Sequence, residues 1–357
     1  MPLGRSFLPE QPSLQSGCSW FWSSFSGPKA CSRRIEMGRR YFTWIVLTIL
    51  IAFPFGADIF YSGFYVSLLT RIFIYAIIVV GFDLLAGYTG MVSYGHALFF
   101  GSGAYLTGMV LKHWTPWFWP PFALTIVVSA LIAYIVGFLS IRTREIYFVF
   151  LTFAFSQFFF VTANSWNFIG ASNGLSGVPK PFIFPGLSLS GENSFYYFAL
   201  ACLVGAYLLA RLITLSAFGR VMVGIRENEE RTKFLGYDTQ KTIIRVFVIS
   251  GIYGGVAGAL LAAFNSFVSP NLYHPAVSGE IIMMALLGGM GTLVGPMIGS
   301  GLVIVLGDIL SSWLAESWMM ILGGIFAGFI LFSPGGVMAL AQKIGSWVKR
   351  ERKHGHP

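Results

Sequence analysis

Apolar residues run through this chain in long stretches that polar residues interrupt only briefly. A helix that crosses the hydrocarbon of a bilayer needs roughly 20 predominantly apolar residues. Stretches of this kind begin near Tyr41, Val66, Met91, Trp119, Glu145, Phe195, Thr242, Gly279, Leu293 and Ser317. They are too long and too uniformly apolar for barrel strands, and helices pair their backbone polar groups internally. The pattern therefore predicts an all-α fold, a polytopic transmembrane helical bundle.

Glycines interrupt the stretch over residues 279–310. Its first half has about 12 residues, which is short for a full crossing, and Gly288 and Gly289 break the run. We therefore expect a broken or re-entrant segment here. The bundle is predicted to contain about ten helical segments, with eight as the alternative.

The placement of basic residues predicts which side of the membrane each loop faces. The net charge is +9, and 18 of the 23 Lys and Arg residues fall in four segments, 29–40, 142–144, 220–245 and 343–353. These segments share one side if successive spans alternate, as in the positive-inside pattern. Both termini are then cytoplasmic. The basic excess sets orientation, so we do not expect a nucleic-acid partner.

Three regions are predicted along the chain. Residues 1–36 show no helical or strand period and are either a disordered extension or lie upstream of the true start at Met37. Residues 37–348 form the transmembrane domain, and residues 349–357 form a basic cytoplasmic tail. Cys18, Cys31 and Cys202 form no spaced set, which predicts neither a disulfide framework nor a metal site, and no cofactor is expected.

Ionisable residues inside spans are candidates for function, because charge at membrane depth is costly. Arg71, Glu280 and Asp308 are expected near outer ends of spans, and Asp83 and Arg211 near inner ends, where each can snorkel to an interface. No carboxylate, His or Lys is placed at mid-span with a partner. This argues against a proton relay and an ion-coupled carrier.

The loop over residues 216–241 holds nine of the 37 charged residues. Residues 221–235 are predicted to form one helix, with Gly236 at its C-terminal cap. Glu227 with Arg231, and Glu229 with Lys233, are i,i+4 pairs in the favourable order. Such a helix cannot bury itself, so it is either a solvated surface helix or a helix docked in the groove of another protein.

Several ordered motifs resemble a known family. They are 87–97 (GYTGMVSYGHA), 101–105 (GSGAY), 142–147 (RTREIY), 172–179 (SNGLSGVP), 219–236 (GRVMVGIRENEERTKFLG), 287–292 (LGGMGT) and 332–336 (FSPGG). In these residues, roughly 41–348, the chain resembles the membrane permease subunits of branched-chain amino acid ABC importers.

The resemblance implies a cell inner-membrane permease that works with a second homologous permease subunit, two cytoplasmic ATP-binding subunits and an extracytoplasmic substrate-binding protein. No phosphate-binding loop motif occurs in the sequence, so ATP hydrolysis is expected on a separate chain and this chain is not expected to be an enzyme. The residues expected to couple to the ATPase are Gly219, Arg220, Arg226, Glu227, Asn228, Glu230 and Gly236. The candidates for the substrate pathway are Tyr88, Gly90, Tyr94, His96, Asn173, Gly174, Gly288, Gly289 and Gly291.

Alternatives remain for several of these assignments. His96, Tyr88 and Tyr94 also fit a reading as packed side chains between helices, and the glycines also fit a helix-packing seam. A urea or short-amide permease would share these features, since specificity is expected to lie mostly in the binding protein. A channel or ion-coupled carrier that acts alone, or a membrane scaffold or lipid-modifying enzyme, would belong to other classes.

Overall fold

The structure is a computed structural model that describes residues 53–54, 63–143, 146–184, 187–313, 317–332 and 336–338. The predicted extension 1–36, the start at Met37, the basic tail 349–357 and nearly all of the first predicted span lie outside these residues. So do Arg144, Glu145 and part of the motif at 332–336. The fold and the site below are therefore built from Gly63 onward.

Helices dominate the described residues, which confirms the predicted all-α membrane bundle. In chain order they are α3 (Gly63–Thr89), α4 (His96–His113), α5 (Trp119–Ser140), α6 (Ile146–Ser165), α7 (Glu192–Leu215), α8 (Ala217–Glu227), α9 (Glu229–Phe234), α10 (Thr239–Asn265), α11 (Pro275–Gly288), α12 (Val294–Trp313) and α13 (Trp318–Phe332). Among the described helices, six are long and apolar enough to cross a membrane: α3, α5, α6, α7, α10 and α12.

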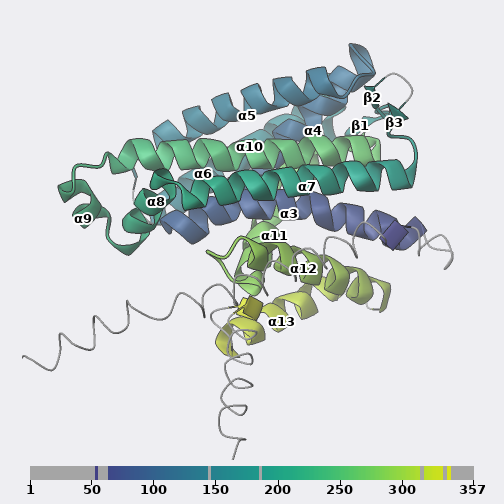
Figure 1. Ribbon diagram of the computed structural model, residues 1–357. Coiled ribbons are helices and arrows are strands. Elements are labelled where there is room, and N and C mark those ends of the chain that lie inside the picture. Colours follow the sequence, from purple (N-terminus) through teal and green to yellow (C-terminus); the bar gives the residue numbers. More distant parts are fainter. Residues whose placement is uncertain are drawn as a thin grey trace, which may run out of the picture. The chain divides into compact units, whose positions relative to one another are not determined.

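Two ends of the bundle can be distinguished in Figure 1. At one end, β1 (Leu175–Ser176) pairs antiparallel with β4 (Phe267–Val268), and β2 (Phe182–Phe184) pairs antiparallel with β3 (Leu187–Ser188). Helices α8 and α9 lie at the opposite end of the long helices α3, α7 and α10. We call these the strand end and the α8 end.

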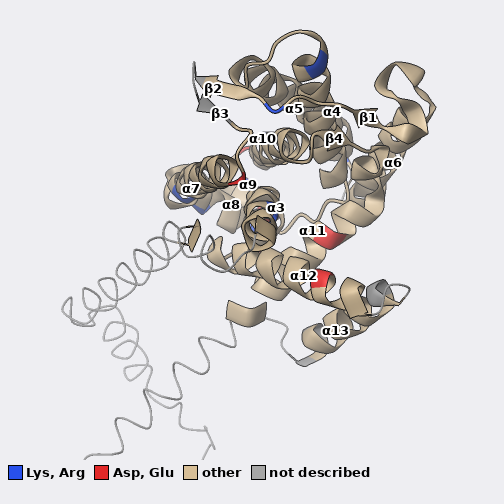
Figure 2. Ribbon diagram, turned by 90° about the vertical axis from the view of Figure 1, so that its right-hand side faces the viewer, with Lys and Arg blue, Asp and Glu red and all other residues tan. Residues whose placement is uncertain are grey.

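Helix α10 lies at the centre of the bundle and packs against α3, α4 and α5, as the end-on view in Figure 2 also shows. Glycines bring α4 and α10 into contact. A Cβ atom on Gly103 would lie 2.1 Å from the carbonyl oxygen of Gly255, and one on Gly258 would lie 2.0 Å from that of Phe100. Small residues at such contacts let helix backbones approach closely in lipid.

Helices α4 and α11 both begin inside the bundle rather than at its ends. The predicted start near Met91 is wrong, because Gly90 has a φ of +78° and the next five residues are not helical, so α4 begins at His96. The first turn of α4 meets the first turn of α11, where the Ala97 N–H donates to Ser278 Oγ at 2.9 Å. The η4 turn (Pro270–Tyr273), just before α11, accepts a bond from Ser156, which lies halfway along α6.

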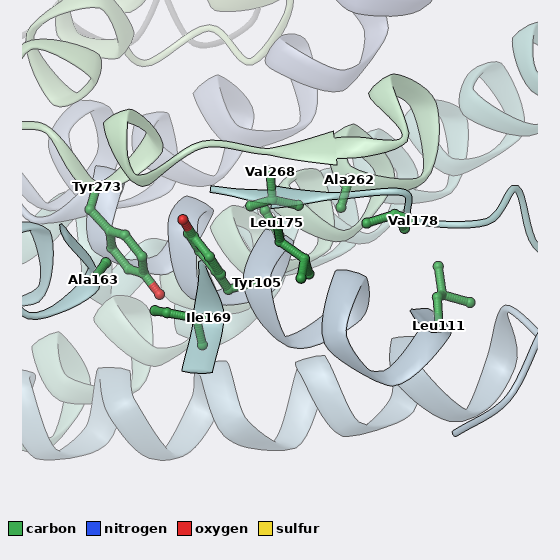
Figure 3. Close-up of a cluster of buried hydrophobic side chains, with 10 residues drawn as sticks. Tyr105, Leu111, Ala163, Ile169, Leu175, Val178, Ala262, Val268 and Tyr273 are labelled. Atoms are coloured by element: carbon green, nitrogen blue, oxygen red, sulfur yellow. The ribbon is translucent and has the colours of Figure 1, made fainter. Parts of the chain in front are cut away.

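The segment between α6 and α7 packs onto the strand end of the helices. It contains the short turns η2 (Asn167–Ile169) and η3 (Ala171–Asn173). Figure 3 shows a buried cluster that joins this segment to α4, α10 and η4. Within the cluster the rings of Tyr105 and Tyr273 stack with their centroids 5.6 Å apart. This packing fixes the position of Asn173 and Gly174.

Candidate functional site

Asp83, near the end of α3, holds the turn between α11 and α12. Its side chain is fully buried, its Oδ1 accepts the Gly291 N–H at 2.6 Å, and its Oδ2 accepts the Leu293 N–H at 3.1 Å. The prediction that Asp83 snorkels to an interface is wrong, because these backbone donors satisfy the carboxylate inside the protein. We call residues 288–293 the glycine turn.

The backbone of the glycine turn is held in unusual conformations. Gly289 and Gly291 have φ angles of 103° and 81°, which glycine adopts freely, but Leu293 has a φ of 57°. A left-handed conformation costs a residue with a Cβ about 1 to 2 kcal/mol. The two hydrogen bonds to Asp83 offset this cost, since hydrogen bonds to charged groups are stronger than those between neutral groups.

Arg226, on α8, also contacts the end of α3 and the glycine turn. Its Nη1 donates to the carbonyl oxygen of Gly87, one turn after Asp83 on α3. A Cβ atom on Gly87 would lie 2.5 Å from the Gly291 nitrogen, and one on Gly291 would lie 3.0 Å from Arg226 Nη1. The three segments therefore meet only because both positions are glycine. We call Asp83, Gly87, Arg226, Gly291 and Leu293 the junction.

The charged loop folds as two helices, so the prediction of one helix over 221–235 is wrong. Asn228 is extended, with a φ of −163°, and its side chain caps α9 by accepting the Arg231 N–H at 2.8 Å. The Glu229–Lys233 ion pair forms at 2.6 Å, as predicted, whereas Glu227 and Arg231 lie on different helices. Asparagine favours caps over helix interiors because its side chain competes for backbone donors.

One face of α8 packs on the bundle, and most of the other residues of the loop are exposed. Gly219, Met222 and Ile225 are buried at helical spacing, while Arg220, Glu227 and Glu230 are exposed. After α9 the chain turns at Gly236, which has a φ of 89° and follows the helix end as predicted. Around this turn lie three exposed apolar side chains, Phe234 (90%), Leu235 (71%) and Tyr237 (52%).

The predicted pathway residues do not gather at one point but lie at three levels along the bundle. Asn173 and Gly174 are at the strand end, next to the β1–β4 pair. Tyr94 and His96 lie in the middle, where α4 begins. The α8 end holds the others, Tyr88, Gly90, Gly288, Gly289 and Gly291.

Individual pathway candidates differ in what surrounds them. His96 is fully buried, with Nε2 2.7 Å from Ser250 Oγ and its ring edge-on to Phe82, an arrangement that packs α4 against α3 and α10. Tyr94 is only partly buried, and its hydroxyl oxygen lies 3.9 Å from the position of a Cβ on Gly279 of α11. Gly90 is exposed and lies against Arg226, which connects a predicted pathway residue to a predicted coupling residue.

Sequence reasoning missed the role of Asp83 in the junction. A signal was present, since an acidic residue inside an apolar span is a functional candidate by default. Its partners could not be read from the sequence, because Gly291 and Leu293 are 208 and 210 positions away. Within the described ranges, no group of three or more His, Cys, Asp or Glu side chains is placed to hold a metal ion.

Comparison with known proteins agrees with this helical membrane architecture. Residues 64–333 match the model of a family described as the branched-chain amino acid transport system / permease component. The chain belongs to this family of permeases. The match spans every described helix that could cross a membrane, from α3 to α12, together with the junction and the α8–α9 segment.

Curated members of the family align over most of the chain. The high-affinity branched-chain amino acid transport system permease protein LivM of Salmonella typhimurium is 27% identical, over 89% of this chain and 80% of the relative. LivM of Escherichia coli is 27% identical, over 93% and 82%. The E. coli permease protein LivH is 25% identical, over 67% and 82%. No solved structure gives a significant match.

Proposed function

We propose that this permease is the membrane subunit of an ABC importer that carries branched-chain or related amino acids across the inner membrane. It works with a second homologous permease subunit, two cytoplasmic ATP-binding subunits and an extracytoplasmic substrate-binding protein. The α8 end faces the cytoplasm. The junction carries this proposal, because it connects a charged loop outside the apolar spans to the turn between two membrane helices.

The α8–α9 segment has the properties of a docking surface for the ATP-binding subunits. Charged side chains surround three exposed apolar ones, Phe234, Leu235 and Tyr237. Exposed aromatic anchors within a charged rim are typical of protein interfaces. The buried face of α8 fixes the segment to the bundle, so that a push on it reaches the membrane helices.

Transmission would run through the junction. A displacement of α8 moves Arg226, which is bonded to the last turn of α3, and Asp83 of α3 is bonded to the glycine turn. The turn can rearrange because glycines permit several backbone conformations. Alternating access needs an element with two discrete arrangements, and the glycine turn is our candidate.

Reconstitution of the chain tests this function. The chain is placed in liposomes with its second permease, its ATP-binding subunits and its binding protein, and uptake of labelled leucine is measured with and without ATP. We expect uptake to depend on ATP and on every subunit. Leucine uptake driven by an ion gradient without the ATP-binding subunits would indicate an independent carrier, and uptake of urea instead of leucine would indicate a urea or amide permease.

A substitution in the junction tests whether it couples ATP hydrolysis to uptake, independently of whether the complex assembles. We expect Arg226→Gln to lower uptake per ATP hydrolysed by about fivefold or more, since it removes a charged hydrogen bond worth about 1.5 to 3 kcal/mol. ATP hydrolysis itself should continue. Arg211→Gln, at an exposed position on α7, is the matched control and should leave the ratio unchanged. An unchanged ratio in Arg226→Gln would contradict transmission through the junction.

A further inference from the structure

The sequence motif at residues 332–336 lies outside the junction, but its last residue reaches the glycine turn. Residues 336–338 are helical and follow α13, and we call them the return segment. Gly336 is buried. A Cβ atom placed on it would lie 2.5 Å from the nitrogen of Gly289, 2.6 Å from its Cα atom and 2.9 Å from the carbonyl carbon of Gly288. The return segment therefore lies directly against the backbone of the glycine turn.

Two separate features require glycine at position 336. Its φ is 72°, a left-handed conformation in which a residue with a Cβ atom is disfavoured roughly 5- to 30-fold. The space that a side chain would need is also filled by the backbone of Gly288 and Gly289. A flexible side chain could turn aside for a new Cβ atom, but a peptide backbone cannot. Any larger residue at this position would force the return segment and the glycine turn apart.

The glycine turn is thus held at two places. Asp83 accepts hydrogen bonds in the later half of the turn, from the N–H groups of Gly291 and Leu293. The return segment contacts the earlier half, at Gly288 and Gly289. Each half of the turn therefore has a contact from a distant part of the chain that limits its movement.

The contact with the return segment restricts how the earlier half can change. The atoms nearest to the Cβ position of Gly336 belong to the peptide group that joins Gly288 to Gly289 and to the Cα atom of Gly289. A change of the backbone dihedral angles at either residue moves this peptide group. Packed interiors are dense and shift between discrete arrangements rather than deforming continuously. The peptide group therefore rotates only after the return segment has moved away.

The return segment can separate from the turn without opening the bundle. Its other two residues, Val337 and Met338, are only half-buried. Segments with few buried apolar side chains open locally at a lower free energy than the core. Helix α13, which precedes the segment, packs against α11 and α12 (Figure 1) and keeps it near the turn.

We propose that the return segment regulates the glycine turn. While Gly336 rests against Gly288 and Gly289, the turn keeps its present arrangement, and the segment separates from the turn when the turn rearranges during transport. Gly336 is a positioning residue that acts through the turn. This regulation rests on the proposed function, and it adds a control from the C-terminal side of α13 to the push that arrives through α8.

The reactivity of a cysteine in the glycine turn tests this proposal. The three native cysteines are replaced by serine, the half-buried Met290 is replaced by cysteine, and labelling by N-ethylmaleimide is timed in the assembled complex without nucleotide. We expect Gly336→Ala to raise the labelling rate about fivefold or more, because the new Cβ atom separates the segment from the turn.

Gly177→Ala is the matched control. Gly177 has a φ of 73°, nearly that of Gly336, but no atom lies within 4 Å of the new Cβ position. It therefore carries the same backbone strain without the contact, and the labelling rate should stay unchanged. An unchanged rate in Gly336→Ala, or an equal rise in both variants, would overturn the proposal.

Amide hydrogen exchange in the unaltered complex covers the case in which Gly336→Ala does not assemble. Exchange at residues 288–293 and 336–338 is compared with and without a nonhydrolysable ATP analogue. We expect the analogue to speed exchange in both segments together, since local opening exposes their N–H groups. Unchanged exchange in the return segment would overturn its role and leave the importer intact. Leucine uptake that needs no ATP-binding subunits would overturn the proposed function and this regulation with it.

Discussion

The six helices long enough to cross a membrane fall into two groups that share apolarity but not surroundings. The most apolar windows of α3 and α10 have mean hydropathies of 2.1 and 2.0 and are each 78% buried inside the protein. Those of α5, α6, α7 and α12 have mean hydropathies between 1.7 and 2.5, but only 22 to 33% of each is buried. Apolarity is therefore enough for insertion into lipid, but it does not decide which helix occupies the centre.

The buried positions of α5 show how one outer helix packs on the bundle. On α5 they carry mainly small or hydroxyl side chains, which repeat at helical spacing, whereas its large apolar side chains, such as Leu131 and Ile135, point outward. Helices in lipid gain little from burying apolar surface and associate through close packing and hydrogen bonds. The face of α5 that packs on the bundle is thus distinguished by small size and polarity.

The largest effect is expected at the contact of α4 and α10. Gly103→Leu would force a side chain against the Gly255 carbonyl and separate α4 from α10, at a cost of about 3 kcal/mol or more. The fraction of protein that stays monodisperse after heating in detergent should fall strongly. Gly205→Leu, on α7 with no atom within 4 Å of the new Cβ, is the control. Equal loss in both variants would mean that the close contact of α4 with the central helix α10 is no more sensitive to added volume than the open surface of α7.

A smaller effect on stability and a large effect on transport are expected at Asp83. Asp83→Ala would leave the Gly291 and Leu293 N–H groups without their acceptor, at a cost of about 1 to 3 kcal/mol for each buried donor. Uptake should fall roughly tenfold or more, while Asp83→Asn, which keeps one acceptor oxygen, should retain part of it. Asp308→Asn on the outer helix α12 serves as the comparison. Wild-type uptake by Asp83→Ala would remove the junction from the mechanism.

The smallest effects are expected on α5, and they test the two faces of one outer helix. Thr125 is fully buried and its hydroxyl lies 2.9 Å from that of Thr107 on α4, whereas Leu131 is 57% exposed. Thr125→Val should lower stability by about 0.6 kcal/mol, the average for hydrogen bonds between membrane helices. Leu131→Ala should lower it by less than that. The thermal unfolding midpoints of the two variants test this order. A larger loss in Leu131→Ala than in Thr125→Val would contradict the stabilising role of the buried hydroxyl on α5.

Several elements could be predicted because their causes are local. The observed starts of α5, α6 and α12 lie at or within one residue of the predicted starts at Trp119, Glu145 and Leu293, since prolines, charged residues or glycines interrupt the apolar runs just before them. The cap at Gly236 and the ion pair of Glu229 with Lys233 also depend only on neighbours along the chain. The break at Asn228 was missed although its cause is local, because charge pairing was weighed above the capping preference of asparagine.

The sequence by itself determined that this chain is a helical membrane protein, where most of its helices begin, and through its motifs the family of permeases to which it belongs. The tertiary structure alone decided which distant backbone groups the charged side chains bind. Asp83 joins the glycine turn across 208 positions, and Arg226 joins α3 across 139. Helical periodicity predicts contacts between residues three or four positions apart. The long-range contacts depend instead on how separate helices pack against one another, and glycines and hydroxyl side chains at the helix contacts influence that packing.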